Sequence, residues 1–91
     1  MSTTTRERRA TIRLTLYTRS GCHLCHEMRA VVEAAAHAHA AVLEEIDVDG
    51  DPALAATYGA EVPVLCVNGR KAFKYRVEPR ALDARLAREL A

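Results

Sequence analysis

The stretch LTLYTRSGCHLC, residues 14–25, decides the fold predicted for this chain. Ile12, Leu14 and Leu16 alternate with Arg, Thr and Tyr, and this period of two predicts a strand with one buried face. A Ser-Gly pair then ends the strand. Residues 23–40 are rich in Ala, Glu, Met and Arg, with apolar residues at helical spacing, which predicts a helix. Two cysteines three residues apart therefore stand where a strand turns tightly into a helix.

Turn and capping signals divide the rest of the chain into further elements. Asp51-Pro52 provides an N-cap followed by proline at the first helical position, and Gly59 suits the C′ position after that helix. Asn68-Gly69 is a strong hairpin signal, and Glu78-Pro79 opens a last helix. We expect strands at 43–48, 62–67 and 71–75, helices that start at 52 and 79, and Leu82, Leu86 and Leu90 along the buried face of the last helix.

The resulting order of elements is β-α-β-α-β-β-α. The first βαβ unit requires two parallel strands joined by a right-handed crossover, whereas the Asn-Gly hairpin requires an antiparallel pair. The chain is therefore expected to form an α/β fold with a mixed sheet. Its 91 residues correspond to one small domain, which we place at residues 11–91, after a flexible tail at residues 1–10.

Composition and charge disfavour several classes of function. The net charge is +1 with both signs interspersed, so we expect no nucleic-acid partner, although RERR at residues 6–9 is a local basic patch. No apolar run approaches the roughly 18–20 residues that span a bilayer, so no membrane association is expected. Residues 1–10 lack the hydrophobic stretch of a signal peptide, and three cysteines do not make an even set of structural bridges. We expect a cytoplasmic protein, and a monomer.

Residues 22–26, CHLCH, permit three kinds of cysteine chemistry. The pattern C-x-x-C-H occurs at c-type haem attachment sites, whereas C-x-x-C after a strand is typical of a redox dithiol. Haem is disfavoured because its attachment is usually an export-side process and a strand–helix sandwich leaves no obvious cavity. Zinc is disfavoured because there is no second closely spaced pair of ligands. Its ligands would be Cys22, Cys25, His26 and Cys66. We therefore expect a dithiol, without a cofactor or a metal.

The positions of the cysteines assign a different role to each. Free N–H groups and the dipole at the start of a helix stabilise a thiolate, so Cys22 is expected to be the exposed nucleophile. Cys25 lies three residues further on the same helical face, within reach of a disulfide after modest adjustment, and is expected to be the resolving thiol. Cys66 lies inside an apolar strand and is expected to serve packing. His23 either tunes the Cys22 thiolate or is a solvent-facing turn residue, and Arg19 either attracts an anionic substrate or is simply solvated.

The run LTLYTRSGCHLC, the Val62-Pro63 step before a strand and the element order β-α-β-α-β-β-α together resemble glutaredoxins, which are small proteins with the thioredoxin fold. More narrowly, FKYRVEP at residues 73–79 is similar to short bacterial glutaredoxin-like proteins. The resemblance covers about residues 11–90. It implies a three-layer fold with strand order 2-1-3-4, one helix on one face of the sheet and two on the other. It also implies that Pro63 is cis and lies beside the active cysteines, and that the backbone of Val62 pairs with the substrate.

The sequence departs from the usual glutaredoxin pattern at three places. His23-Leu24 stands where many glutaredoxins have Pro-Tyr, and Glu61 stands where they have Thr. Residues 76–79, RVEP, stand where they have a Gly-Gly pair and an acidic pair that hold glutathione. We therefore expect glutathione to be a poor electron donor to this protein.

The predicted function is that of a thiol–disulfide oxidoreductase that reduces protein or mixed disulfides through the Cys22–Cys25 dithiol. Its partners would be a client protein with a disulfide and a reductant, either glutathione or a protein dithiol reductase. The alternative is a non-catalytic module of the same fold that binds zinc, an iron–sulfur cluster or a protein partner through the same face.

Overall fold

The computed structural model describes residues 11–90, apart from the side chain of Leu90. The predicted tail at residues 1–10 lies outside this range. The elements follow in the predicted order, with one short 3₁₀ helix, η1, added after the second strand. They are β1 (Arg13–Thr18), α2 (His23–Ala38), β2 (Val42–Asp47), η1 (Val48–Gly50), α3 (Pro52–Tyr58), β3 (Val64–Val67), β4 (Arg70–Lys74) and α4 (Pro79–Leu90).

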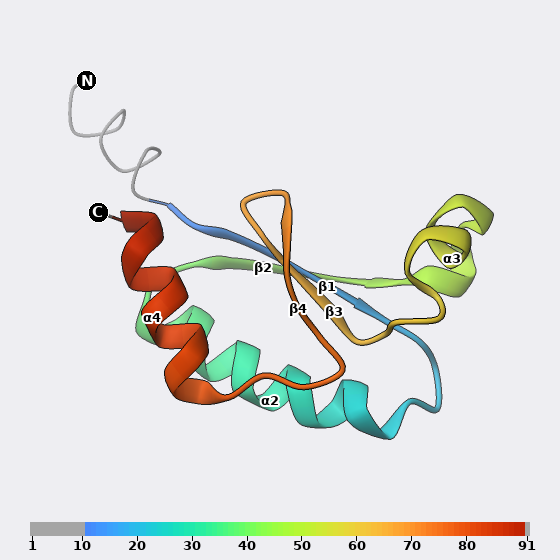
Figure 1. Cartoon of the computed structure of the whole chain (residues 1–91), viewed down its shortest axis with the longest axis horizontal. Helices are drawn as coiled ribbons and strands as arrows, with labels where there is room; N and C mark the ends of the chain where they lie inside the picture. Colours follow the sequence, from blue (N-terminus) through green and yellow to red (C-terminus); the bar gives the residue numbers. More distant parts are fainter. Residues whose placement is uncertain (1–10, 91) are drawn as a thin grey trace.

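The four strands form one mixed sheet in the order β2-β1-β3-β4. β1 and β2 are parallel, whereas β1 pairs with β3, and β3 with β4, in the antiparallel direction. Strand order and pairing confirm the predicted α/β fold. Figure 1 shows α2 and α4 side by side on one side of the sheet, with α3 apart from both.

The main core lies between the sheet and the pair formed by α2 and α4. Alternation along β1 directs Leu14 and Leu16 into it, as the sequence predicted. Leu82 and Leu86 of α4 are fully buried, which confirms the predicted face of that helix, while the side chain of Leu90 lies outside the described residues. The buried residues of this core are Ile12, Leu14, Leu16, Met28, Val32, Ala35, Ala36, Leu65, Val67, Leu82 and Leu86.

The opposite face of the sheet is covered by α3 near the end of β1. Because side chains alternate along a strand, Tyr17 points away from the core that contains Leu16. Its ring stacks on that of Tyr58 at the end of α3, with 4.1 Å between the ring centroids. Val64 and Cys66 of β3 are buried on the same face. The fold thus has the three expected layers, with two helices on one face and one on the other.

The bounds of β2, β3 and β4 differ from the prediction by one or two residues, and two of these differences have a backbone reason. β3 begins at Val64 and not at residue 62, since Pro63 has no N–H to donate to a ladder. β4 ends at Lys74 because Tyr75 adopts a left-handed backbone, with φ of 69°, which turns the chain away from the sheet. Alternation of residue types along the chain reveals neither effect.

Gly59 ends α3 for a reason that the sequence did not reveal. The prediction that Gly59 occupies the C′ position was wrong by one residue, since Gly59 is the C-cap, with φ of −55°. A Cβ at this position would collide with the carbonyl oxygen of Ala55 and lie 2.8 Å from Nη2 of Arg19. Nη1 of Arg19 donates a hydrogen bond to the Gly59 carbonyl at 3.0 Å. Glycine is therefore required here because a Cβ would overlap the backbone of the preceding helical turn and would also crowd the end of the Arg19 side chain.

This explanation predicts that Gly59→Ala lowers the free energy of unfolding by about 1–3 kcal/mol, because the added methyl group overlaps the Ala55 carbonyl oxygen and displaces the end of α3. Chemical denaturation of the oxidised protein measures the effect. Gly50→Ala is the matched control, because a Cβ on Gly50 meets no atom within 4 Å. Equal stability of the two alanine variants would contradict the steric explanation.

Candidate active site

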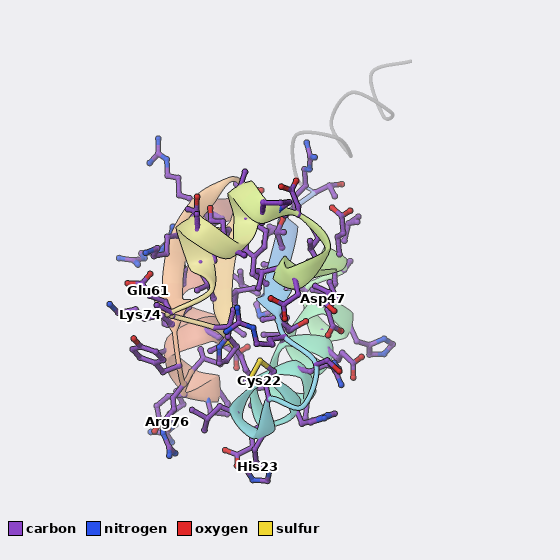
Figure 2. The ribbon with its side chains drawn as sticks, turned by 90° about the vertical axis from the view of Figure 1, so that its right-hand side faces the viewer. Cys22, His23, Asp47, Glu61, Lys74 and Arg76 are labelled. Carbon is purple, nitrogen blue, oxygen red and sulfur yellow. A yellow bond between two sulfur atoms is a disulfide. The ribbon has the colours of Figure 1, made fainter. Side chains whose placement is uncertain are left out.

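Cys22 and Cys25 form a disulfide at the start of α2, with 5.2 Å between their Cα atoms (Figure 2). Gly21, with φ of 76°, makes the turn that leads from β1 into this helix, and the left-handed backbone favours glycine there. Cys22 is partly exposed, whereas Cys25 is only 1% exposed. A substrate sulfur approaching from solvent therefore meets Cys22 first.

The start of α2 is suited to hold a negative charge on Cys22. Cys22 is the N-cap of the helix, and its Sγ accepts a hydrogen bond of 3.1 Å from the backbone N–H of Cys25. No acidic residue lies in the first turn of α2, so no carboxylate there offsets the positive end of the helix dipole. In the reduced protein, the same N–H and dipole would stabilise the Cys22 thiolate.

The Val62-Pro63 segment lies at the same end of the sheet as the cysteines, and its peptide bond is cis. Val64 pairs with Tyr17, one residue before β1 ends and the chain enters the turn to Cys22. The Pro63 carbonyl accepts a hydrogen bond of 2.8 Å from the Tyr75 N–H. Within residues 11–90, the backbone N–H and C=O of Val62 have no hydrogen-bond partner. They are therefore open to an extended segment of another chain.

His23 does not contact the sulfur of Cys22. Its side chain is 86% exposed, and Nε2 lies 3.0 Å from Oε2 of Glu27, one turn further along α2. Figure 2 shows the ring at the outer end of the helix, pointing away from Cys22. The structure thus matches the solvent-facing alternative for His23, and no contact supports the tuning of the thiolate.

Arg19 holds the cysteine turn against α3 and η1. Its guanidinium donates to both carboxylate oxygens of Asp49, at 2.9 and 3.1 Å, and to the Gly59 carbonyl. The hydrogen bonds and charge of Asp49 raise the pKa of Arg19. Arg19 is therefore not simply solvated, which was one of its two predicted alternatives; the attraction of an anionic substrate stays a prediction, for a charge that is already paired with Asp49. The pairing joins residues 30 positions apart, which local sequence signals do not reveal.

A group that the sequence did not indicate anchors α2 beside the site. Thr18, at the end of β1, donates to Oε2 of Glu45 at 3.0 Å, and Nε of Arg29 donates to Oε1 of Glu45 at 2.8 Å. Another nitrogen of Arg29 lies 3.1 Å from Nδ1 of His26, which follows Cys25. One signal in the sequence could have indicated this group. Alternation along the predicted strand puts Glu45 on the same face as Leu43, which packs against the core, and a charge on such a face needs a partner.

This ion pair predicts a pH dependence of stability. The hydrogen bonds from Arg29 and Thr18, with the charge of Arg29, hold the pKa of Glu45 below its ordinary value of 4.5. A carboxyl group whose pKa is lower in the folded than in the unfolded state stabilises the fold at pH values above its unfolded-state pKa. This stabilisation is lost as the pH falls through the folded-state pKa. We expect Glu45→Gln to be less stable than the wild type at pH 7 and to lose less stability than the wild type below pH ~4.5.

Urea midpoints between about pH 3 and pH 7 test this, with exposed Glu44→Gln as the control. A constant difference across this range would contradict the role of Glu45.

Cys66 stays apart from the dithiol. It is a free cysteine, 4% exposed, and burial raises the pKa of its thiol. Among the side chains of residues 11–89, no three of His, Cys, Asp and Glu lie together so that they could hold a metal ion. Cys66 and His26 therefore do not complete a four-ligand site with the cysteine pair.

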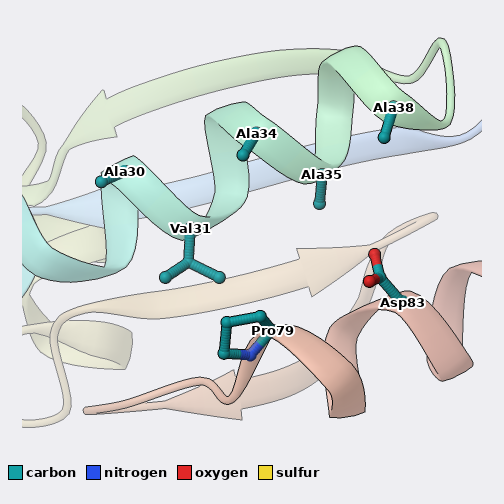
Figure 3. A pocket seen from close by; sticks show the side chains of 7 residues that line it. All are labelled: Ala30, Val31, Ala34, Ala35, Ala38, Pro79 and Asp83. Carbon is teal, nitrogen blue, oxygen red and sulfur yellow. The ribbon is translucent and has the colours of Figure 1, made fainter.

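A groove lies between α2 and α4, outside the cysteine site (Figure 3). It has a volume of about 450 Å³ and is lined by Ala30, Val31, Ala34, Ala35, Ala38, Pro79 and Asp83. Its one charged group, Asp83, already pairs with Nε2 of His39 at 3.1 Å. The groove therefore offers no reactive group, and the cysteine pair remains the candidate site.

Among the described residues, no helix combines the length and the apolar character that crossing a membrane requires.

Residues 13–91 match the protein family described as Glutaredoxin-like domain (DUF836). The chain belongs to this family. A solved structure of a structural-genomics target protein from X. campestris has 34% sequence identity over 82% of this chain and 96% of its own, with a TM-score of 0.70. A protein from Nitrosomonas europaea has 32% identity over 81% of this chain and 89% of its own, with a TM-score of 0.69. No curated protein matches the sequence.

The glutaredoxin-like chain is also similar to thioredoxins in fold. A mutant thioredoxin from Halobacterium salinarum NRC-1 has 27% identity over 88% of this chain and 75% of its own, with a TM-score of 0.69. The predicted membership in a glutaredoxin-like, thioredoxin-fold family is confirmed. This glutaredoxin-like protein thus has a cysteine pair at disulfide distance at the start of a helix in a thioredoxin fold.

Proposed function

We propose that this protein is a thiol–disulfide oxidoreductase that reduces disulfides of client proteins. The observation that carries the proposal is the unequal exposure of two cysteines at disulfide distance at the start of α2. Cys22 is accessible and its sulfur accepts an N–H bond, while Cys25 is buried beside it. One sulfur is thus available to a client, and the other is placed to release that client.

The reaction begins from the reduced dithiol. The Cys22 thiolate attacks one sulfur of the client disulfide, the client S–S bond breaks, and the leaving sulfur takes up a proton. Cys25 loses its proton and attacks the Cys22 sulfur, which breaks the mixed disulfide and releases the second client thiol. The client gains two electrons and two protons, and the protein is left with the Cys22–Cys25 disulfide.

Val62 and Pro63 are proposed to guide the client. The free backbone N–H and C=O of Val62 would form a short antiparallel pair with an extended client segment. A client held in this way has its disulfide near Cys22, because the Val62-Pro63 segment and the cysteine turn share one end of the sheet. We propose that the protein works as a monomer in the cytoplasm, where thiols are kept reduced.

Reduced protein mixed with a disulfide-bonded protein such as insulin tests this function. Acid quenching, alkylation and mass mapping should show client thiols appearing as the thiols of Cys22 and Cys25 disappear, while Cys66 keeps its thiol. Unchanged thiols in both proteins would contradict the proposal. Stoichiometric zinc or iron in the purified protein, without thiol exchange, would favour the non-catalytic module.

We propose that the natural reductant is a protein dithiol reductase and predict that glutathione serves poorly. Glutathione has two carboxylates, and its affinity depends on a few fixed donors. At the start of α4, Pro79 has no N–H to donate, and exposed Glu78 repels a carboxylate. Loss of one charge-assisted hydrogen bond costs about 1.5–3 kcal/mol, or roughly one to two decades of affinity.

The experiment measures the turnover of one substrate, a mixed disulfide with glutathione, with two different electron sources. We expect slow turnover with glutathione and its reductase, and faster turnover with thioredoxin reductase. Glu78→Gln should raise the rate with glutathione, because it removes a repelling charge. Rapid turnover with glutathione alone would show that Arg76 or Arg80 holds the carboxylate, and the prediction would be wrong.

A further inference from the structure

Strand pairing places five residues of the four strands at the end of the sheet beside the cysteine turn. Thr18 of β1 pairs with Asp47 of β2, Tyr17 pairs with Val64 of β3, and Val64 pairs with Lys74 of β4. Since β2 and β4 are the two edges of the sheet, Asp47 and Lys74 lie on opposite sides of the central strands. Figure 2 shows Cys22 between them, with Arg76 on the side of Lys74. Charges of opposite sign therefore flank the disulfide.

The β4 side keeps a positive charge. Glu61 pairs with both Lys71 and Lys74, the latter at 3.1 Å between Nζ and Oε2. One carboxylate faces two ammonium groups, so this cluster is not neutral. The guanidinium of exposed Arg76 has no ion-pair partner among the described residues. We call Lys71, Lys74 and Arg76 the basic rim.

Tyr75 fixes the basic rim next to the predicted client-binding segment. Its N–H donates to the Pro63 carbonyl at 2.8 Å, and its hydroxyl donates to the Ala60 carbonyl at 3.4 Å. Its left-handed φ of 69° is unusual for a large side chain and reverses the chain between Lys74 and Arg76. Tyr75 is 42% exposed, and Nζ of Lys74 lies 5.5 Å from the centroid of its ring. The rim and the Val62-Pro63 segment are thus one continuous surface.

The β2 side has the opposite sign. Asp49 is paired with Arg19, but the carboxylate of Asp47 accepts only the backbone N–H of Asp49, at 2.9 Å. Asp47 forms no salt bridge within the described residues, and its charge acts on Arg19 only as a minor addition to that of Asp49. An extended client segment that crosses Cys22 would therefore meet positive groups at one end and a carboxylate at the other.

We propose that the basic rim selects client segments that carry Asp or Glu beside the target disulfide, on the side that meets β4. This inference rests on the proposed function and names the chemistry of its client. Charges at the rim of an interface act mainly on the association rate, which complementary charge raises by about 10- to 1000-fold at low salt. The acidic residues also orient the client, because the reverse orientation places them at Asp47.

Two synthetic peptides test the selection. Each has one internal disulfide, and they differ only in having Glu or Lys at the positions that flank the cysteines. Reduced protein in excess is mixed with each peptide, and acid-quenched samples give the second-order rate constant for the appearance of peptide thiols. We expect the Glu peptide to react about tenfold faster at low salt, and the preference to shrink near 1 M salt, where the Debye length is about 3 Å.

Arg76→Glu should reduce this ratio to near one, and Arg76→Gln should give an intermediate ratio. Arg88→Glu makes the same change of net charge near the end of α4, far from the start of α2 in Figure 1, and should leave the ratio as in the wild type. Equal rates for the two peptides, an unaltered ratio in Arg76→Glu, or an equal change in Arg88→Glu would overturn the inference. If the wild type reduces neither peptide nor insulin, the proposed function itself fails.

Discussion

Replacement of Cys22 by serine is expected to abolish disulfide reduction, with a loss of about a thousandfold or more. A serine hydroxyl is not ionised near pH 7, whereas the thiolate is the nucleophile in thiol–disulfide exchange. No other described cysteine can take over, because Cys25 is 1% exposed and Cys66 is 4% exposed. The measurement is the rate of insulin reduction by the reduced variant.

Cys66→Ala is the matched control for this experiment. It also removes one sulfur, but from a buried position in β3, and should retain most of the activity while losing some stability. Iodoacetamide should modify Cys22 of the reduced wild type well before Cys66, whose buried thiol has a raised pKa. An equal loss of activity in the two variants would mean that the roles of the cysteines are assigned wrongly.

Cys25→Ser is expected to stop the reaction halfway. Cys22 can still attack the client, but no neighbouring thiol releases the mixed disulfide, so a covalent adduct of protein and client should accumulate. Turnover should fall by about a hundredfold. Non-reducing gel electrophoresis and mass mapping should place the adduct on Cys22.

The double variant Cys22→Ser/Cys25→Ser is the control for this adduct, since it lacks both reactive sulfurs and keeps Cys66. An adduct of similar yield in the double variant would show that Cys66 is reactive. Release of the client from Cys25→Ser at the wild-type rate would show that another thiol resolves the intermediate.

Local signals were sufficient for most of the fold. The alternation of Leu14 and Leu16 predicted β1, and Asp51-Pro52 predicted the start of α3, where the Asp51 carboxylate accepts the Ala53 N–H at 2.8 Å. The Asn68-Gly69 pair predicted the antiparallel hairpin of β3 and β4. These elements depend on side chains and backbone preferences within a few residues, so they are visible without the tertiary structure.

The sequence by itself determined the cysteine pair, its place at a helix start and the burial of Cys66, because the spacing of residues along one helix or strand sets these features. Only the tertiary structure decided the partners of charged side chains. Arg19 meets Asp49 and Gly59 through the packing of α3, and Glu45 meets Arg29 through the packing of α2 on β2. The same holds for the basic rim, which faces Asp47 across the sheet because β4 and β2 are its two edges. Long charged side chains have many local conformations of similar energy, so the partner that the fold brings near selects among them.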